Sequence, residues 1–122
     1  MGNKKVLAVL EDLFFSVKIN ESAKRSGLPV EFVKSEHDAM AKARLQPALI
    51  IIDLNFQGID VLKLIAELKA DVETKGISLI GYVSHVQGEL KQQAQVAGCN
   101  MVLARSAFSQ NLPQILKRHA AA

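Results

Sequence analysis

The sequence has a single cysteine, Cys99, among its 122 residues. One cysteine forms no internal disulfide and no CxxC metal or redox motif, which favours a reducing compartment. Long apolar runs are missing as well, because Glu11 and Asp12 end the run from Val6 to Leu10 far short of a signal peptide or a membrane span. We therefore expect a cytoplasmic protein that does not cross a membrane.

Concentrated charge and cofactor motifs are also absent. The formal net charge is +3, and the 15 Lys and Arg residues are scattered without a run longer than a pair, so we expect no nucleic-acid partner. The sequence contains no GxGxxG, no GxxxxGK[ST] and no GxSxG motif. Dinucleotide, P-loop nucleotide and serine-hydrolase sites therefore lack their signatures, which argues against a cofactor-binding α/β enzyme.

Four short runs are apolar almost throughout: residues 6–10, 48–52, 77–83 and 101–104. A strand with one solvent-exposed face would alternate between apolar and polar residues instead. Unbroken apolar runs are typical of parallel strands that helices cover on both faces. A fifth candidate, Val30 to Val33, has Glu31 inside it and follows Pro29, which is typical of an edge strand.

Segments with helical periodicity separate these strands. Residues 13–26 predict a first helix that ends at Gly27, a good C-cap residue. Its inward-facing stripe is expected to be Leu13, Phe14, Val17 and Ala23. A short second helix should follow Ser35, which has capping-box spacing to Asp38, and should stop before Pro47.

Three further helices are predicted. Residues 59–69 and 86–97 have helical spacing, and the second of these ends at Gly98. The last helix is expected to start near Ser109 or Asn111. It should bury Leu112, Ile115 and Leu116. Five βα units in one chain of this length predict a single domain, residues 1–122, that forms a doubly wound α/β sandwich around a five-stranded parallel sheet.

Polar residues follow the buried strands at their carboxyl ends, where open parallel sheets form their binding crevice. Glu11 and Asp12 follow the first run, Asp53 the third strand, Ser84 the fourth and Arg105 the fifth. Carboxylates, a hydroxyl and a guanidinium around one point are suited to a divalent cation and a phosphoryl group. Asp53 is the expected nucleophile.

This arrangement resembles the response-regulator receiver (CheY-like) family over nearly the whole chain. The family has an acidic pair after the first strand, a phosphoacceptor Asp after the third, Thr or Ser after the fourth and Lys-Pro after the fifth. The corresponding residues here are Leu10-Glu11, Asp53, Ser84 and Arg105-Ser106. The resemblance implies a flavodoxin/CheY-like fold with strand order 2-1-3-4-5.

The resemblance also implies a function. A histidine kinase would donate a phosphoryl group to Asp53, with Ser84 hydrogen-bonding it and Arg105 supplying the positive charge of the usual Lys. Mg²⁺ would be bound, weakly, by Glu11, Asp12, Asp53 and the backbone carbonyl of Asn55. A downstream protein would bind the face made by the fourth helix, the fifth strand and the fifth helix of a monomer or weak homodimer.

The departures from the family pattern leave alternatives open. Leu10 replaces an acid, for which Asp12 is a candidate substitute, and Arg105 is expected to pair with Asp53 or Glu11. These changes, together with His85 after Ser84 and Val102 in place of the family's usual aromatic residue, also suit a pseudo-receiver that binds proteins without phosphorylation. Purely structural roles remain as well: the acids of the site as caps of loops and helices, and Ser84 as the start of the fourth helix.

Overall fold

Five strands and five helices alternate along the chain, as predicted. The structure, a computed structural model, describes residues 5–84 and 88–121. The elements are β1 (Val6–Val9), α1 (Leu13–Arg25), β2 (Val30–Val33), α2 (Glu36–Ala43), β3 (Leu49–Asp53), α3 (Val61–Ala70), β4 (Leu79–Val83), α4 (Gly88–Ala97), β5 (Met101–Ala104) and α5 (Arg105–Ala121). None of the described helices has the length and apolar character needed to span a membrane.

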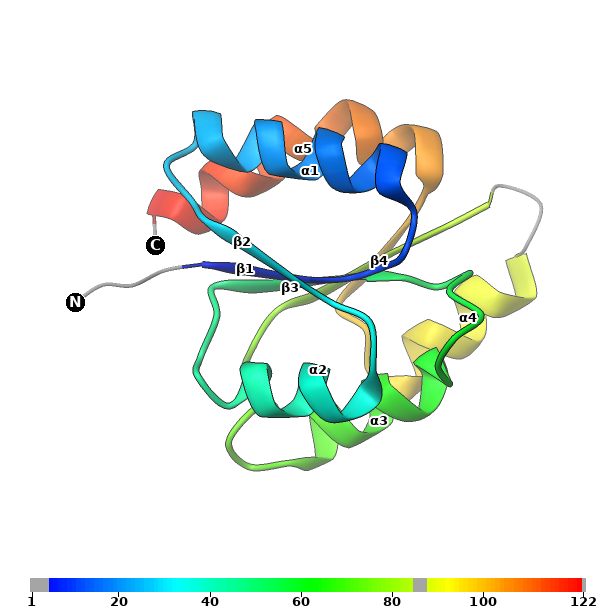
Figure 1. Cartoon of the computed structure of the whole chain (residues 1–122). Coiled ribbons are helices and arrows are strands. Elements are labelled where there is room, and N and C mark those ends of the chain that lie inside the picture. Colours follow the sequence, from blue (N-terminus) through cyan, green and yellow to red (C-terminus); the bar gives the residue numbers. More distant parts are fainter. Residues whose placement is uncertain (1–4, 85–87, 122) are drawn as a thin grey trace.

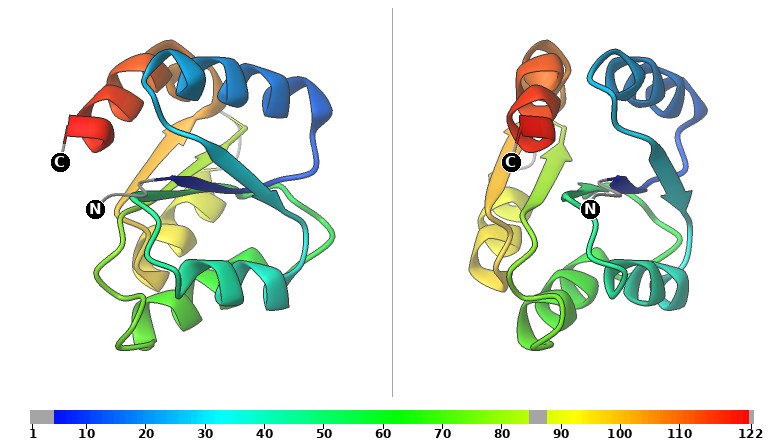
Figure 2. Two further views of the ribbon diagram at one scale, coloured as in Figure 1. Left: turned by 60° about the vertical axis from the view of Figure 1, so that its left-hand side comes forward. Right: turned by 90° about the vertical axis from the view of Figure 1, so that its left-hand side faces the viewer.

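The strands form one parallel sheet in the order β2-β1-β3-β4-β5, which confirms the predicted topology. Each parallel connection needs a crossover, and the crossover helix packs on one face of the sheet. Helices α1 and α5 cover one face, and α2, α3 and α4 cover the other (Figure 1). Figure 2 shows the same two layers from two other directions. The strand order reverses between β1 and β3, so the crevice is expected beyond their carboxyl ends.

Each face of the sheet has its own apolar core. Aliphatic side chains dominate the face under α2, α3 and α4, with Leu64, Ile65 and Leu68 of α3 fully buried. The face under α1 and α5 contains an aromatic cluster of Phe15, Tyr82 and Phe108. This second core reaches the predicted site, because Tyr82 is the register partner of Asp53 and Phe15 follows closely after Asp12 at the start of α1.

The predicted inward stripe of α1 is wrong for three of its four residues. The buried side chains of α1 are Phe15, Ile19 and Ala23. The exposed ones are Leu13, Phe14 and Val17, which are 75%, 79% and 59% exposed. Positions four residues apart share one helix face, and both sets have that spacing. The tertiary structure selects the stripe that contains Phe15, because this ring packs at a tilt against the rings of Tyr82 and Phe108.

The predicted start of the last helix is also wrong. Helix α5 begins at Arg105, directly after β5, and Pro113 lies inside it. The predicted Leu112, Ile115 and Leu116 are buried, but Phe108 is buried one turn earlier. Phe108, Leu112 and Leu116 recur every four residues, so their burial favours one continuous helix in spite of the proline.

The capping predictions hold. The Ser35 hydroxyl accepts a hydrogen bond from the Asp38 backbone N–H at 3.1 Å, and α2 ends before Pro47. Gly27 follows α1 with a φ of 75°, a left-handed conformation that glycine adopts at low cost. The predicted start of the fourth helix at Val86 falls outside the described residues.

The sequence predictions for the two edge strands, β2 and β5, differ in their agreement with the structure. Val30–Val33 is an edge strand, as Glu31 and Pro29 predicted. The strand Met101–Ala104 is the opposite edge, in agreement with the predicted order 2-1-3-4-5. The expected cover on both of its faces is incomplete, because Met101 is exposed and Val102 is the one buried residue of this strand.

Candidate functional site

The predicted residues Asp53, Ser84 and Arg105 lie at the carboxyl ends of three adjacent strands, β3, β4 and β5. The loops after β3 and β4 are joined, because the Ser84 backbone N–H donates to the side-chain oxygen of Asn55 at 3.1 Å. Asp53 is the register partner of Tyr82 on β4. Three of the strand-end residues chosen from the sequence therefore belong to one edge of the sheet.

Asp53 is the buried carboxylate among the described residues, with 8% of its surface exposed. Its Oδ1 accepts a hydrogen bond from the Asn55 backbone N–H at 2.9 Å. Burial raises the pKa of Asp53 above its ordinary value, and the negative charge of Asp12 adds to this. The Asn55 N–H and the Arg105 charge oppose the rise without cancelling it. The carboxylate is therefore poorly solvated and close to a cation.

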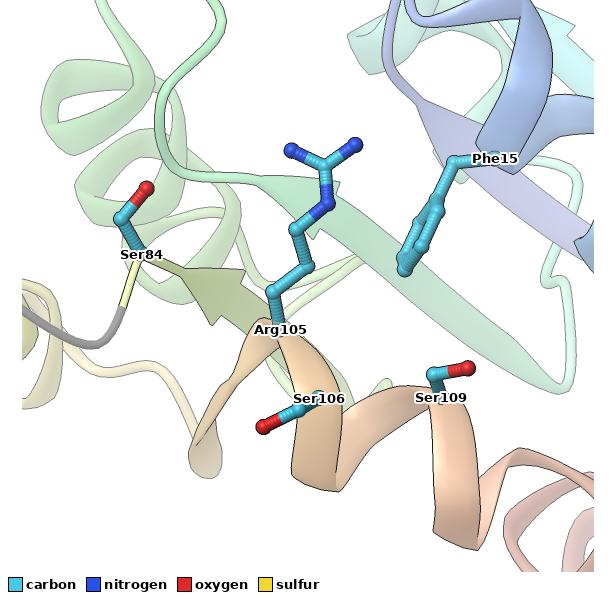
Figure 3. Close-up of a pocket in the computed structure, with 5 residues that line it drawn as sticks. All are labelled: Phe15, Ser84, Arg105, Ser106 and Ser109. Carbon is cyan, nitrogen blue, oxygen red and sulfur yellow. The ribbon is translucent and has the colours of Figure 1, made fainter.

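Arg105 pairs with a different carboxylate from the ones predicted. Its Nη2 donates to Oδ2 of Asp12, and no ion pair joins it to Asp53 or Glu11, all of which the structure describes. Helix α5 starts at Arg105 itself, so the side chain extends from the first turn toward α1. The guanidinium carbon lies 4.5 Å from the centre of the Phe15 ring, in cation–π contact. Figure 3 shows Arg105 between Ser84 and Phe15.

Asp12 has the structural role that the sequence left open. It is the N-cap of α1, and its Oδ1 accepts from the Phe15 backbone N–H at 3.2 Å. Burial raises the pKa of Asp12, but the Phe15 N–H and the Arg105 guanidinium outweigh it, so the pKa lies below its ordinary value. Both carboxylate oxygens of Asp12 are thus engaged by the protein.

The residues present fit a magnesium ion only in part. Leu10 stands where the family has an acid, and it is 1% exposed, so an apolar side chain fills that position. Glu11 is exposed to solvent. Within the described part of the chain, no group of three or more His, Cys, Asp or Glu side chains is arranged to hold a metal ion. Glu11, Asp53 and the Asn55 carbonyl remain as the predicted oxygen donors.

A surface pocket of about 360 Å³ lies beside Arg105, between α1 and α5. Its lining residues are Phe15, Ser84, Arg105, Ser106 and Ser109 (Figure 3). The sequence had identified two of these, Ser84 and Arg105. It missed Phe15, because the phase of α1 was wrong, and Ser109, because α5 was expected to start there. His85, which follows Ser84, lies outside the described residues, as does the segment that would test Ser84 as the start of the fourth helix.

Comparisons with known proteins give a clear answer at the level of structure. Neither a family model nor a curated protein sequence matches the chain. The phosphorylated cyanobacterial phytochrome response regulator RcpA is similar at a TM-score of 0.80 and 25% identity, over 96% of this chain and 91% of that one. A chemotaxis response regulator of Vibrio cholerae has a TM-score of 0.81 and 21% identity, over 97% and 99% of the two chains.

A third similar structure is the receiver domain of a sensor histidine kinase from Pseudomonas aeruginosa PAO1, which has a magnesium ion coordinated in its active-site cleft. Its TM-score is 0.82 at 20% identity, and the match covers 99% of this chain and all of that one. All three structures span nearly their full length in the comparison. The chain therefore has the CheY-like fold of these response-regulator and receiver-domain structures.

Proposed function

We propose that this domain acts in two-component signalling by accepting a phosphoryl group on Asp53 from a histidine kinase. The observation that carries the proposal is a buried carboxylate at the end of a central strand, with a guanidinium nearby. A carboxylate in this position is a nucleophile held in a fixed orientation by the Asn55 N–H. A purely structural cap would not need the burial that raises its pKa.

In the transfer, the Asp53 oxygen that is not bonded to Asn55 forms a new bond to phosphorus. The bond from phosphorus to the donor breaks, and the electron pair leaves with the donor atom, a nitrogen in a phosphohistidine. Charge builds up on the three equatorial phosphoryl oxygens during this step. Arg105 is close enough to act on the charge of Asp53 and would neutralise part of this build-up. Ser84, at the end of β4, would donate a hydrogen bond from its hydroxyl.

Magnesium would supply further charge neutralisation if it binds. Glu11, Asp53 and the Asn55 carbonyl are the donors we propose for it, and one or two carboxylates are what Mg²⁺ ordinarily takes from a protein. Asp12 would have to give up both its capping bond and Arg105 to join them. We therefore propose weak binding of the ion and leave Asp12 out of the set.

Signalling would then pass to a protein partner. Exposed apolar side chains occur on the face formed by α4, β5 and α5, where Val96 is 82% and Met101 38% exposed. We propose this face as the docking surface for the downstream target. Phosphorylation would shift the population of its conformations rather than create a new fold.

A second candidate is a module that binds its partner without phosphorylation. Two observations favour it: the buried Leu10 in place of an acid, and the Asp12–Arg105 ion pair, which occupies the cation of the site at rest. In this case the unmodified fold would already be the binding form.

Incubation with acetyl phosphate, with and without Mg²⁺, followed by intact-mass measurement separates the two candidates. We expect one phosphoryl group on the wild-type protein and none on Asp53→Asn. Asp60→Asn, which changes the exposed N-cap acid of α3, is the matched control and should be modified like the wild type. A wild-type protein that stays unmodified under all conditions contradicts the phosphoacceptor function and leaves the second candidate.

A further inference from the structure

Tyr82 of β4 has a buried hydroxyl without a hydrogen-bond partner in the described part of the chain. The residue is 1% exposed. A buried hydroxyl without a partner costs free energy, and native structures pair nearly all such groups. The two aromatic residues packed against it, Phe15 and Phe108, carry no polar atom on the ring. A phenylalanine at position 82 would preserve the same stacking without an unpaired hydroxyl.

The ring of Tyr82 is fixed in its place under the site. Its centroid lies 4.9 Å from that of Phe108, to which it is stacked, and 4.8 Å from that of Phe15. Tyr82 is also the register partner of Asp53 on the neighbouring strand, so the two side chains leave the same face of the sheet side by side. The Arg105 guanidinium carbon is 6.0 Å from the ring centre.

The hydroxyl is a donor that makes no hydrogen bond to either carboxylate of the resting site, Asp12 or Asp53. Burial and the negative charge of Asp53 raise the pKa of Tyr82, so the hydroxyl keeps its proton. Arg105 has only donors. Asp12 uses one oxygen for the Phe15 N–H and the other for Arg105, and Asp53 Oδ1 accepts from Asn55. The Tyr82 hydroxyl therefore has no partner among the described groups of the resting site.

We propose that Tyr82 is a further binding residue of this site, whose hydroxyl donates a hydrogen bond to an oxygen of the phosphoryl group on Asp53. The inference rests on the proposed phosphorylation of Asp53. A phosphoryl group brings three strong acceptor oxygens to the end of β3, beside the strand that carries Tyr82. The hydroxyl that is unpaired at rest gains its partner on phosphorylation, which favours retention of the phosphoryl group.

Two measurements test this on the full chain. Tyr82 is the one tyrosine of the sequence, so a protein labelled with ¹³C in tyrosine gives a single Cζ signal, which should shift when acetyl phosphate modifies the wild type but not Asp53→Asn. The Tyr82→Phe variant should lose its phosphoryl group roughly tenfold faster than the wild type, because a hydrogen bond to a charged group is lost. Without phosphate, Tyr82→Phe should melt at the same temperature as the wild type or higher.

The matched control is Thr74→Val, which removes another buried hydroxyl. Thr74 donates to the Leu68 carbonyl at 2.6 Å, away from the strand ends that form the site. It should lower the melting temperature and leave phosphoryl retention unchanged. An adduct that forms on the wild type with no Cζ shift and with equal retention in Tyr82→Phe overturns this inference alone. No adduct on the wild type overturns both it and the proposed function.

Discussion

The site has two halves that are built from different kinds of residue. At the end of β1, Leu10 is buried and Asp12 is committed to capping α1 and to pairing with Arg105. At the ends of β3 and β4, Asp53 is buried with its Oδ1 bonded to the Asn55 N–H, and the Tyr82 hydroxyl has no hydrogen-bond partner among the described residues. The polar groups of the first half have their partners, while the second half has a hydroxyl that lacks one in the described part of the chain.

This difference teaches where the domain can respond to a ligand. Stability favours groups whose hydrogen bonds are complete, and a committed carboxylate such as Asp12 has little to gain from a metal ion. Unpaired polar groups at a buried site are costly at rest and gain the most from an incoming partner. We therefore expect the half at the ends of β3 and β4, the phosphoryl half, to dominate the response to phosphorylation. The half at the end of β1, the β1 half, should contribute little through metal binding.

The largest expected effect is that of Leu10→Asp, which would place a buried carboxylate at the end of β1, as Asp53 does at the end of β3. A buried charge without a partner should lower the free energy of unfolding by more than about 4 kcal/mol in the absence of metal. Millimolar Mg²⁺ should restore part of this stability, because the new carboxylate would join Glu11 and Asp53 as an oxygen donor. Thermal unfolding with and without Mg²⁺ measures both effects.

The uncharged variant Leu10→Asn controls for the loss of packing. It should also be destabilised, but Mg²⁺ should not restore its stability to the same degree. Equal responses of the two variants to Mg²⁺ would contradict our view that the missing acid limits metal binding.

Phe15→Ala tests the aromatic cluster on which the phosphoryl half of the site packs. Removal of a buried phenylalanine ring should cost about 3 kcal/mol, since Phe15 contacts Tyr82, Phe108 and the Arg105 guanidinium. Phe14→Ala is the matched control on the next residue of α1, and its ring is 79% exposed. It should change stability by less than about 0.5 kcal/mol in urea unfolding. Similar losses in both variants would show that the phase of α1 differs from the one described.

Asp12→Ala measures how much the capping bond and the ion pair of Asp12 contribute to the stability of the fold. Loss of the N-cap should cost about 1 kcal/mol, and loss of the Arg105 pair should add to this. Asp60→Ala removes the N-cap of α3, which bonds Lys63 N–H at 3.2 Å, and so isolates the capping effect. The difference between the two variants in urea unfolding is then the contribution of Arg105. No difference would mean that the ion pair contributes nothing to stability.

The same pair has a defined pH dependence. The pKa of Asp12 is lowered on folding, so its contribution is present above the unfolded value of about 3.9 and is lost as the pH falls through the folded value. The stability gap between the wild type and Asp12→Ala should therefore shrink in acid.

The smallest expected effect is the stabilisation by Asp53→Asn. Folding raises the pKa of Asp53, so its favourable contribution is present below the unfolded value of about 3.9 and is lost as the pH rises through the folded value. Asp53→Asn should therefore gain stability relative to the wild type between acid and neutral pH, by a few degrees at most in the melting temperature. A variant that is less stable than the wild type at pH 7 would mean that the ionised carboxylate is stabilised at its site.

Much of this fold follows from local patterns in the sequence. Apolar runs identified four of the strands, because strands that helices cover on both faces carry few polar residues, and Glu31 and Pro29 marked the fifth as an edge strand. The Ser35 cap and the turn at Gly27 were also predictable, since they depend on residues three or four positions apart. The phase of α1 was not, because Phe14 and Phe15 are equally apolar, and only the rings of Tyr82 and Phe108 distinguish them.

The sequence by itself determined the sheet and the residues that stand at its carboxyl edge, Asp53, Ser84 and Arg105, because strand ends of a parallel sheet meet at one edge. Only the tertiary structure decided which of these residues interact. Arg105 reaches Asp12 rather than Asp53 because α5 begins directly at Arg105 and faces the N-cap of α1. Tyr82 is part of the site for a similar reason: its neighbours in space come from β3, α1 and α5, far from it in the sequence.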